Sequence, residues 1–271
     1  MAVIGSPVRH SLSPLLHNAA FAALDLNWTS VAFEVAPGHA GAALQGVRAL
    51  GMAGLSVTMP HKNDVAALVD ERSAVVEALR AANCVVNRAG VLRGENTDGA
   101  GFLASLEREA ACDPAGKRCL IVGAGGAARA VTLALAGAGA ATVTVVNRTV
   151  ARAADVAALA GPAGRVGRTG NEAETAEADI VVNATPVGMT GTGEGDSGWL
   201  VLPSWLHRGQ VVVDLVYAPR PTPWLAAAAE FGATVVDGLG MLVHQAAAQL
   251  ELWTGLPAPV DRMWQAASDV L

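Results

Sequence analysis

Along the first hundred residues, segments with two different patterns of apolar and polar positions follow one another in turn. Short runs of apolar residues predict strands, and longer stretches with apolar residues three or four positions apart predict helices. Because strands separated by helices usually form a parallel sheet with right-handed crossovers, this region is expected to be an α/β domain. The predicted strands cover residues 2–4, 31–35 and 55–59, and the predicted helices begin near residue 14 and cover residues 40–50.

A second α/β pattern follows the helix that starts near Gly101. A turn-rich segment, Asp113 to Lys117, separates that helix from a new strand, so we place a domain boundary at the helix. One further helix, residues 241–253, comes after the second sheet is complete, and residues 190–198 are rich in glycine and acids, as expected of a mobile insert. The predicted elements are strands 119–122, 142–146, 180–182 and 211–215 and a helix at 151–159.

Composition argues against a membrane span. Of the 271 residues, 52% are hydrophobic but only 4% are aromatic, and alanine and glycine abound, which suits helices packed closely on a sheet. The most membrane-like stretch, residues 130–146, is broken by glycine and threonine and fits a helix followed by a strand. The first residues lack the basic segment and apolar run of a secretory signal, so a cytoplasmic location is expected.

Charge and cysteine content narrow the classes of partner. A formal net charge of −6 gives no basic surface with which to bind nucleic acid or an anionic membrane. Cys84, Cys112 and Cys119 are odd in number and lack the spacing of metal ligands, which indicates unpaired thiols in a reducing compartment and predicts no metal. The expected partner is a small molecule.

A glycine turn in the second half predicts a dinucleotide site. The sequence Gly123-Ala124-Gly125-Gly126-Ala127-Ala128 follows a predicted strand and opens a predicted helix. The first glycine permits the tight turn, the second allows the backbone to approach a pyrophosphate, and the amides at the helix start face that anion. The alternative is an ordinary glycine turn in a glycine-rich chain.

The end of the next predicted strand favours NADP over NAD. An NAD site usually has Asp or Glu there to bind the ribose 2′-hydroxyl, but this strand ends in Asn147-Arg148-Thr149. Arg148 and Arg152, expected on one helix face, could bind a 2′-phosphate through their guanidinium groups. A solvated arginine pair is the alternative.

Lys62 and Asp98 form the candidate catalytic pair. Pro60 ends the strand 55–59, so Lys62 should begin the next helix at the carboxyl edge of the sheet, where ligands bind. Asp98 lies where the first domain ends and would face the same crevice. Hydride transfer at an alcohol carbon needs a group that takes and returns the hydroxyl proton, and Lys62, held by Asp98, could do so. A solvated lysine and an Asp-Gly turn are the alternatives.

Hydroxyl and amide side chains add weaker signals. Ser13 before Pro14 is typical of a helix N-cap, and Ser11 with Ser13 could hold a small carboxylate. His10 and His17 favour local packing or capping over catalysis. Gln245 and Gln249 lie one turn apart on the last predicted long helix, on a face that could be solvated or could meet a ligand.

Eight motifs in chain order resemble those of the shikimate dehydrogenase family. The resemblance implies reversible reduction of 3-dehydroshikimate to shikimate with NADPH, in the pathway to aromatic amino acids. It also implies a two-lobed α/β fold, with a substrate-binding catalytic domain at 1–101, completed by C-terminal helices within 238–271, and a Rossmann-type NADP-binding domain at 102–237. The motifs are GSPVRHSLSPLLHN from Gly5, VTMPHK from Val57, NTDGAG from Asn96, GAGGAAR from Gly123, NRT from Asn147, NATPVG from Asn183, DLVYAP from Asp214 and GLGMLVHQ from Gly238.

The same resemblance implies roles for individual residues. Lys62 and Asp98 would be the catalytic pair, and Ser11 and Ser13 would bind the substrate carboxylate. The substrate ring hydroxyls would contact Thr58, Asn83 and Gln245, with Tyr217 and Met241 near the substrate and the nicotinamide. The remaining cofactor residues would be Gly123, Ala124, Gly125, Gly126 and Ala127 at the pyrophosphate, Asn147, Arg148, Thr149 and Arg152 at the 2′-phosphate, and also Thr185 and Gly238.

Two departures and three alternatives stay open at the level of sequence. His61 stands where the family usually has a bulky apolar residue, and Cys84 follows Asn83 where threonine is common. The alternatives are an NAD-dependent quinate/shikimate dehydrogenase, an aminoshikimate-type enzyme and a ligand-binding regulator without turnover. The chain is expected to be a monomer or a homodimer.

Overall fold

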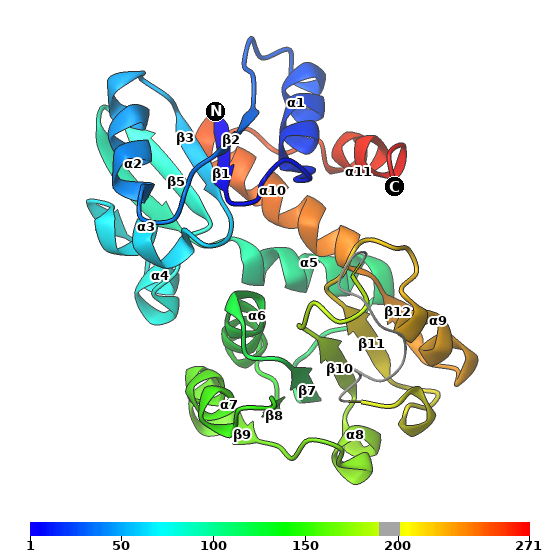
Figure 1. Ribbon diagram of the computed structural model, residues 1–271. Coiled ribbons are helices and arrows are strands. Elements are labelled where there is room, and N and C mark those ends of the chain that lie inside the picture. Colours follow the sequence, from blue (N-terminus) through cyan, green and yellow to red (C-terminus); the bar gives the residue numbers. More distant parts are fainter. Residues whose placement is uncertain (190–200) are drawn as a thin grey trace. The chain divides into compact units, whose positions relative to one another are not determined.

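The computed structural model describes residues 1–189 and 201–271, and the chain divides into two units. Unit 1 consists of Met1–Gly101 and Leu242–Val270, and unit 2 is essentially Phe102–Met241. Each contains one six-stranded sheet (Figure 1). The insert predicted at 190–198 lies outside the described residues.

The sheet of unit 1 has the strand order β2-β1-β3-β5-β6-β4. Its first three strands are parallel, as the alternating pattern predicts, but β5 runs antiparallel to both β3 and β6. The expectation of a wholly parallel sheet is therefore wrong for this unit. The strands are β1 (Ala2–Gly5), β2 (Val31–Glu34), β3 (Gly54–Val57), β4 (Glu71–Arg72), β5 (Cys84–Arg88) and β6 (Val91–Glu95).

A two-residue turn produces the antiparallel pairing of β5 with β6. Ala89 and Gly90 join β5 to β6, and both have positive φ, 52° and 92°. Turns of this kind match the right-handed twist of paired strands and therefore produce a tight hairpin. The sequence signal is weak because alanine seldom adopts positive φ.

Helices cover both faces of the unit 1 sheet. Ile4, Leu55 and Val85 face a core shared with the helices of residues 40–79, whereas Cys84 and Val86 face the other way, against Trp253 of α10. Helix α1 packs on α11. The helices are α1 (Ser13–Ala23), α2 (Ala40–Ala49), α3 (Lys62–Leu68), α4 (Ala74–Leu79), α10 (Gly238–Thr254), of which Leu242 onward belongs to this unit, and α11 (Val260–Ser268).

The sheet of unit 2 is parallel throughout, with the order β12-β11-β10-β7-β8-β9. Counted within the unit, this is the 3-2-1-4-5-6 order of a doubly wound dinucleotide-binding fold, and the order reverses between β7 and β10. The predicted α/β class is confirmed. The strands are β7 (Arg118–Val122), β8 (Thr142–Val146), β9 (Gly164–Val166), β10 (Ile180–Asn183), β11 (Val211–Asp214) and β12 (Thr234–Val236).

Successive residues of β7 enter two different cores. Ile121 shares a core cluster with Val131 and Leu135 of α6, whereas Leu120 shares another with Trp224 and Leu225 of α9. A strand buried on both faces reads as a continuous apolar run, which is why β7 is visible in the sequence. The helices are α5 (Asp98–Ala110), which starts in unit 1, α6 (Gly126–Gly137), α7 (Val150–Ala157), α8 (Glu172–Glu177) and α9 (Pro223–Glu230), with 3₁₀ helices at Ala158–Ala163 and Pro203–Trp205.

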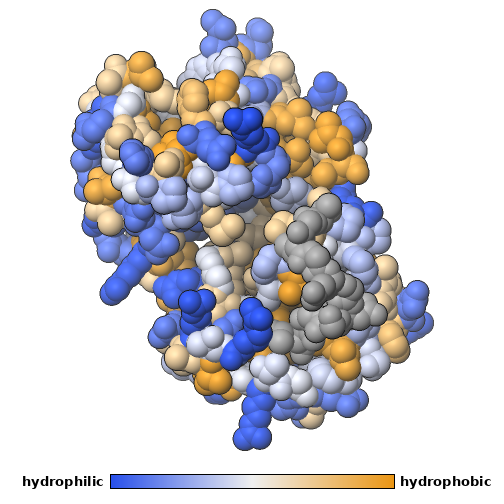
Figure 2. All heavy atoms as spheres, in the orientation of Figure 1, coloured by the Kyte–Doolittle hydropathy of each residue, from blue (hydrophilic) through white to orange (hydrophobic). Residues whose placement is uncertain are grey.

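Hydrophilic and hydrophobic residues are mixed over the face of the molecule in Figure 2. Apolar atoms form a large share of any folded protein surface, so scattered exposed apolar residues need no special explanation. Among the helices that the structure describes, none combines the length and apolar character that crossing a bilayer requires.

Candidate active site

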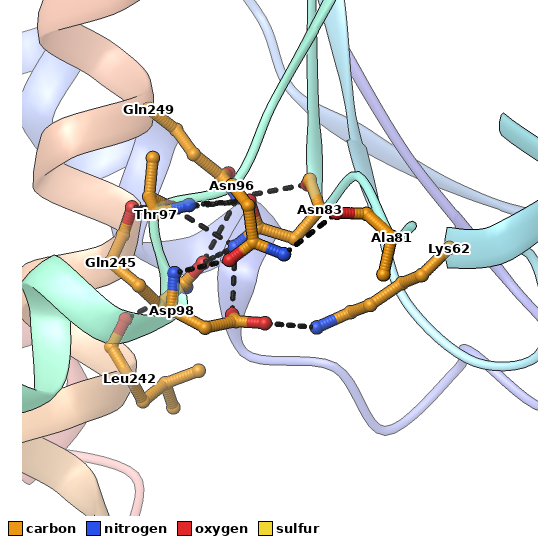
Figure 3. Close-up of polar contacts among 9 residues, drawn as sticks. All are labelled: Lys62, Ala81, Asn83, Asn96, Thr97, Asp98, Leu242, Gln245 and Gln249. Atoms are coloured by element: carbon orange, nitrogen blue, oxygen red, sulfur yellow. Dashed lines mark hydrogen bonds and ion pairs between the residues drawn. The ribbon is translucent and has the colours of Figure 1, made fainter. Parts of the chain in front are cut away.

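Lys62 and Asp98 meet in unit 1. Lys62 is the first residue of α3, three residues after Met59, and Asp98 is the first residue of α5. The Lys62 Nζ atom donates to Asp98 Oδ2 at 2.6 Å, with 22% of the lysine side chain and 9% of the aspartate side chain exposed (Figure 3). The structure therefore joins two residues that lie 36 positions apart, and the lysine side chain stays partly exposed to solvent.

Asn83 completes the environment of the carboxylate. This buried residue precedes β5, and its Nδ2 donates to Asp98 Oδ1 at 2.7 Å. Its Oδ1 accepts from Thr97 N at 2.8 Å, and its Nδ2 also donates to Thr97 Oγ1 at 2.9 Å. Each carboxylate oxygen of Asp98 thus has its own donor. A charge held by two donors on opposite oxygens has one fixed orientation.

The last long helix brings two buried amides to this group. Gln245 Oε1 accepts from Gln249 Nε2 at 2.9 Å and lies 3.4 Å from Asn83 Nδ2 (Figure 3). Gln249 also donates to Asn83 O, and Thr97 Oγ1 donates to Gln245 O. The question left open by the sequence is settled in part, because this face of α10 is buried and not solvated. Thr97 and Gln249 were not singled out as binding residues from the sequence.

Close packing brings α5 and α10 together at this point. A Cβ atom added to Gly101 would lie 2.6 Å from Gln245 N, a separation that real Cβ atoms do not show. Glycine is therefore required for α5 to approach the backbone of Gln245.

Thr58, Ser11 and Ser13 lie at strand and helix ends of the same unit. Thr58 directly follows β3 and is half-buried. The prediction that Ser13 is an N-cap is wrong: Leu12 occupies that position, and Ser13 is the first helical residue, with Pro14 next. Ser11 Oγ accepts from Ser13 N at 3.3 Å, and the helix has no side-chain capping bond.

The glycine turn of unit 2 fits an anion. Gly123 has φ +114°, and a Cβ there would lie 2.8 Å from Ala184 O, so only glycine fits. Gly125 is the N-cap of α6 and has no side chain with which to cap the first amides. The first turn of the helix contains no acidic residue. Gly125 and Gly126 are exposed, with open space where a side chain would lie. Uncapped amides beside open space suit a pyrophosphate at the switch point of the sheet.

The segment after β8 also fits a phosphate, with one correction. Arg148 lies before α7 and not on it, because the helix begins at Val150 and Thr149 is its N-cap. Arg148 and Arg152 are exposed, and neither forms an ion pair with the residues that the structure describes. Asn147 Nδ2 donates to Thr149 O at 3.0 Å and shapes this turn.

The other predicted cofactor residues lie near the carboxyl ends of β10 and β11 or at the start of α10. Thr185 Oγ1 donates to Asn183 Oδ1 at 2.7 Å. Tyr217 is half-buried, and burial raises the pKa of its phenol. Gly238 packs against Leu215 so closely that a Cβ would overlap its carbonyl oxygen, and Met241 packs on the core below α6.

Both departures from the family pattern are accommodated by packing. His61 is buried, and its Nε2 lies 2.7 Å from Val35 O. Cys84 is buried against Trp253, and desolvation raises the pKa of its thiol. Across residues 1–189 and 201–271, no three His, Cys, Asp or Glu side chains gather as a metal site would require.

Three family models match the chain. They are the shikimate dehydrogenase substrate binding domain over residues 3–85, shikimate / quinate 5-dehydrogenase over residues 105–190, and the shikimate 5′-dehydrogenase C-terminal domain over residues 238–267.

Comparison with individual proteins also finds members of the shikimate dehydrogenase family. The shikimate dehydrogenase (NADP⁺) of Moorella thermoacetica is 48% identical over 270 residues, covering 97% of this chain and 90% of the relative. The shikimate 5-dehydrogenase of Thermus thermophilus, solved with NADP(H) and shikimate, is 36% identical with a TM-score of 0.89, covering 100% and 98% of the two chains. The quinate dehydrogenase of Corynebacterium glutamicum, solved with NAD, is 32% identical with a TM-score of 0.90, covering 99% and 98%.

Proposed function

The chain belongs to the shikimate dehydrogenase family, and we propose that it catalyses the reversible NADP-dependent reduction of 3-dehydroshikimate to shikimate. The observation that carries the proposal is the ion pair of Lys62 with Asp98, which lies among the buried amides of Asn83 and Gln245. Three of these residues, Lys62, Asp98 and Gln245, fall in motifs that the sequence shares with the family, and Asn83 matches a family asparagine outside them. The names of the matched relatives supply the substrate and the cofactor.

Proton transfer is assigned to Lys62. In the direction of reduction, its ammonium donates a proton to the oxygen of the carbonyl that becomes the hydroxyl, and in oxidation its amine takes that proton back. Asp98 and Asn83 hold the ammonium and the carboxylate in one geometry, which satisfies the positional requirement of general acid–base catalysis. The exposed fraction of the Lys62 side chain provides a route for the proton to solvent.

NADP is assigned to the residues of unit 2. The exposed amides at the start of α6, with Gly123, Ala124, Gly125, Gly126 and Ala127, would hold its pyrophosphate. Arg148 and Arg152, together with Asn147 and Thr149, would surround the 2′-phosphate, since no acid follows β8 to bind a free 2′-hydroxyl. When bound, the nicotinamide supplies or accepts the hydride. Thr185, Gly238 and Met241 are assigned to the nicotinamide half.

The substrate contacts are assigned by chemistry. Ser11 and Ser13 offer hydroxyl donors for a carboxylate, and Thr58, Asn83, Tyr217 and Gln245 offer donors and acceptors for ring hydroxyls. All these residues come from one chain, so the proposal holds for a monomer or a homodimer. Because the three cysteines are free thiols, we place the enzyme in the reducing cytoplasm, where the pathway to aromatic amino acids would use it.

The proposal is tested by following the absorbance of reduced nicotinamide with purified protein. Shikimate and quinate are each combined with NADP⁺ and NAD⁺, in four reactions at the same pH. Fast turnover with shikimate and NADP⁺ alone is the expected result. Turnover that is faster with quinate or NAD⁺ would move the enzyme to the quinate branch, and silence in all four reactions would contradict the proposal and favour a binding role or an amino-substituted substrate.

A further inference from the structure

A buried histidine of unit 1 has no part in the reaction as described above. His17, on α1, is fully buried, with its ring edge against Trp253 at a centroid separation of 5.0 Å. Its Nδ1 atom lies 3.3 Å from Ser30 Oγ. The Asn18 side chain binds the Ser30 backbone, because its Oδ1 accepts from Ser30 N at 2.8 Å and its Nδ2 donates to Ser30 O at 2.9 Å. The adjacent residues His17 and Asn18 therefore both contact Ser30, His17 at its hydroxyl and Asn18 at its backbone.

The surroundings of His17 decide where its single ring proton lies. Burial and, to a smaller extent, the N-terminal ammonium lower the pKa of His17 from 6.5 to about 3, so the ring is neutral at physiological pH. A contact with Gln249 acts in the opposite direction. His17 Nε2 and Gln249 Oε1 are both buried without a hydrogen-bond partner among the described residues. Gln249 lies one helical turn before Trp253 on α10, the residue that the ring contacts. We therefore place the ring proton on Nε2, toward Gln249 Oε1, so that Nδ1 accepts from the Ser30 hydroxyl.

This arrangement fixes the direction of every amide that follows. Once Gln249 turns its oxygen toward His17, its Nε2 must face Asn83 O and Gln245 Oε1, the two acceptors it contacts at 3.1 and 2.9 Å (Figure 3). Gln245 must then present oxygen to Gln249 and nitrogen elsewhere. Gln245 Nε2 donates to Leu242 O at 2.9 Å, and an amide nitrogen has a second hydrogen to offer.

We propose that His17 is a positioning residue which, through Gln249, sets the orientation of the Gln245 amide so that its N–H group faces the substrate. The inference rests on the proposed function, because it takes Gln245 as a substrate contact. An inverted Gln249 amide would turn its N–H group toward the protonated Nε2 of His17 and its oxygen toward Asn83 O and Gln245 Oε1. Donor would then face donor and acceptor would face acceptor in a buried site, which is unfavourable. His17 makes that inversion unfavourable.

Three variants test the proposal: His17→Phe, which keeps the ring shape and removes the donor, Gln249→Met, and the double variant. For each single variant the KM for shikimate is expected to rise roughly fivefold to tenfold, while kcat changes less than threefold and the KM for NADP⁺ is unchanged. Because both act through one contact, the double variant should lose no more than the larger single loss. Gln265→Met, on the exposed face of α11, is the matched control.

His17→Gln supplies the rescue, since its amide nitrogen can replace Nε2 as a donor to Gln249. It should restore the KM for shikimate to within twofold of the unsubstituted enzyme. The proposal is overturned if His17→Phe and Gln249→Met only lower the melting temperature and leave that KM unchanged, or if their effects on KM multiply in the double variant. Failure of the proposed function would be seen separately, as absence of shikimate turnover in the unsubstituted enzyme.

Discussion

Replacement of Lys62 by alanine separates its catalytic role from its structural role. General acid–base groups contribute about 10²- to 10⁴-fold to rate, so Lys62→Ala should lower kcat for shikimate oxidation at least about a hundredfold, about 2.7 kcal/mol of activation free energy. The KM for NADP⁺ should change less than twofold, because the assigned cofactor residues belong to unit 2.

The structural cost follows from the ion pair. Breaking a fully buried pair costs about 3–5 kcal/mol, but here 22% of the lysine side chain is exposed and Asn83 still donates to the carboxylate. We therefore expect a loss of about 2 kcal/mol, which lowers the melting temperature by about 4–8 °C. Lys62→Arg keeps the positive charge beside Asp98 but cannot release a proton at neutral pH, so it should recover most of the stability and little of the activity.

The assay is steady-state shikimate oxidation, with thermal unfolding measured on the same preparations. Lys117→Ala is the matched control, because Lys117 is the only other lysine and is exposed in unit 2. Lys62→Ala with unchanged kcat and tenfold weaker NADP⁺ binding would refute the assignment, as would a Lys62→Arg variant of full activity.

Three further predictions concern the cofactor, a helix contact and pH. Arg148→Ala should raise the KM for NADPH about tenfold or more and hardly change that for NADH, as measured by steady-state kinetics, and equal losses would contradict the 2′-phosphate assignment. Gly101→Ala should lower the free energy of unfolding, measured in urea, by about 1–3 kcal/mol because its Cβ would overlap Gln245. Gly137→Ala, exposed on α6 with open space around it, should raise the free energy of unfolding by up to about 1 kcal/mol. Changes of the same sign in both variants would refute the packing argument. The folded pKa of His17 is lowered from 6.5 to about 3, so its contribution to stability is full above pH 6.5 and declines as the pH falls toward 3, by up to about 1.4 kcal/mol per pH unit. In thermal unfolding, His17→Phe should therefore lose less stability between pH 6.5 and 4.5 than the unsubstituted chain. Parallel curves would show that the pKa of the ring is not lowered by folding.

Sequence patterns predicted those elements whose local signals agree with the fold. The apolar run 119–122 and the glycine turn after it identify β7 and the start of α6, because a strand buried on both faces and a turn that needs positive φ both restrict residue type. The hairpin of β5 and β6 was not predicted. Its turn is Ala89-Gly90, and alanine carries no signal for positive φ.

For the candidate site, the sequence predicted which residues take part, but not which side chains contact one another. Position after a predicted strand and at a predicted domain end, together with motif resemblance, selected Lys62 and Asp98. Their 2.6 Å contact, however, depends on α3 and α5 starting at the same edge of the unit 1 fold. The environment of Gln249 depends on which face of α10 lies on β5, and spacing along one helix cannot reveal that. Arg148 was placed on a helix because its neighbours favour one, although α7 begins two residues later.

The division of unit 1 along the sequence has a consequence for biosynthesis. On the ribosome, Met1–Gly101 emerges long before Leu242–Val270, so Cys84, Val86 and Trp28 must wait for Trp253 to cover them. Unit 2 is essentially one continuous stretch and can fold as soon as it leaves the tunnel. During synthesis the N-terminal domain usually folds first, and we expect this order to be reversed here. Until Leu242–Val270 is available, the exposed apolar residues of Met1–Gly101 would be bound by chaperones.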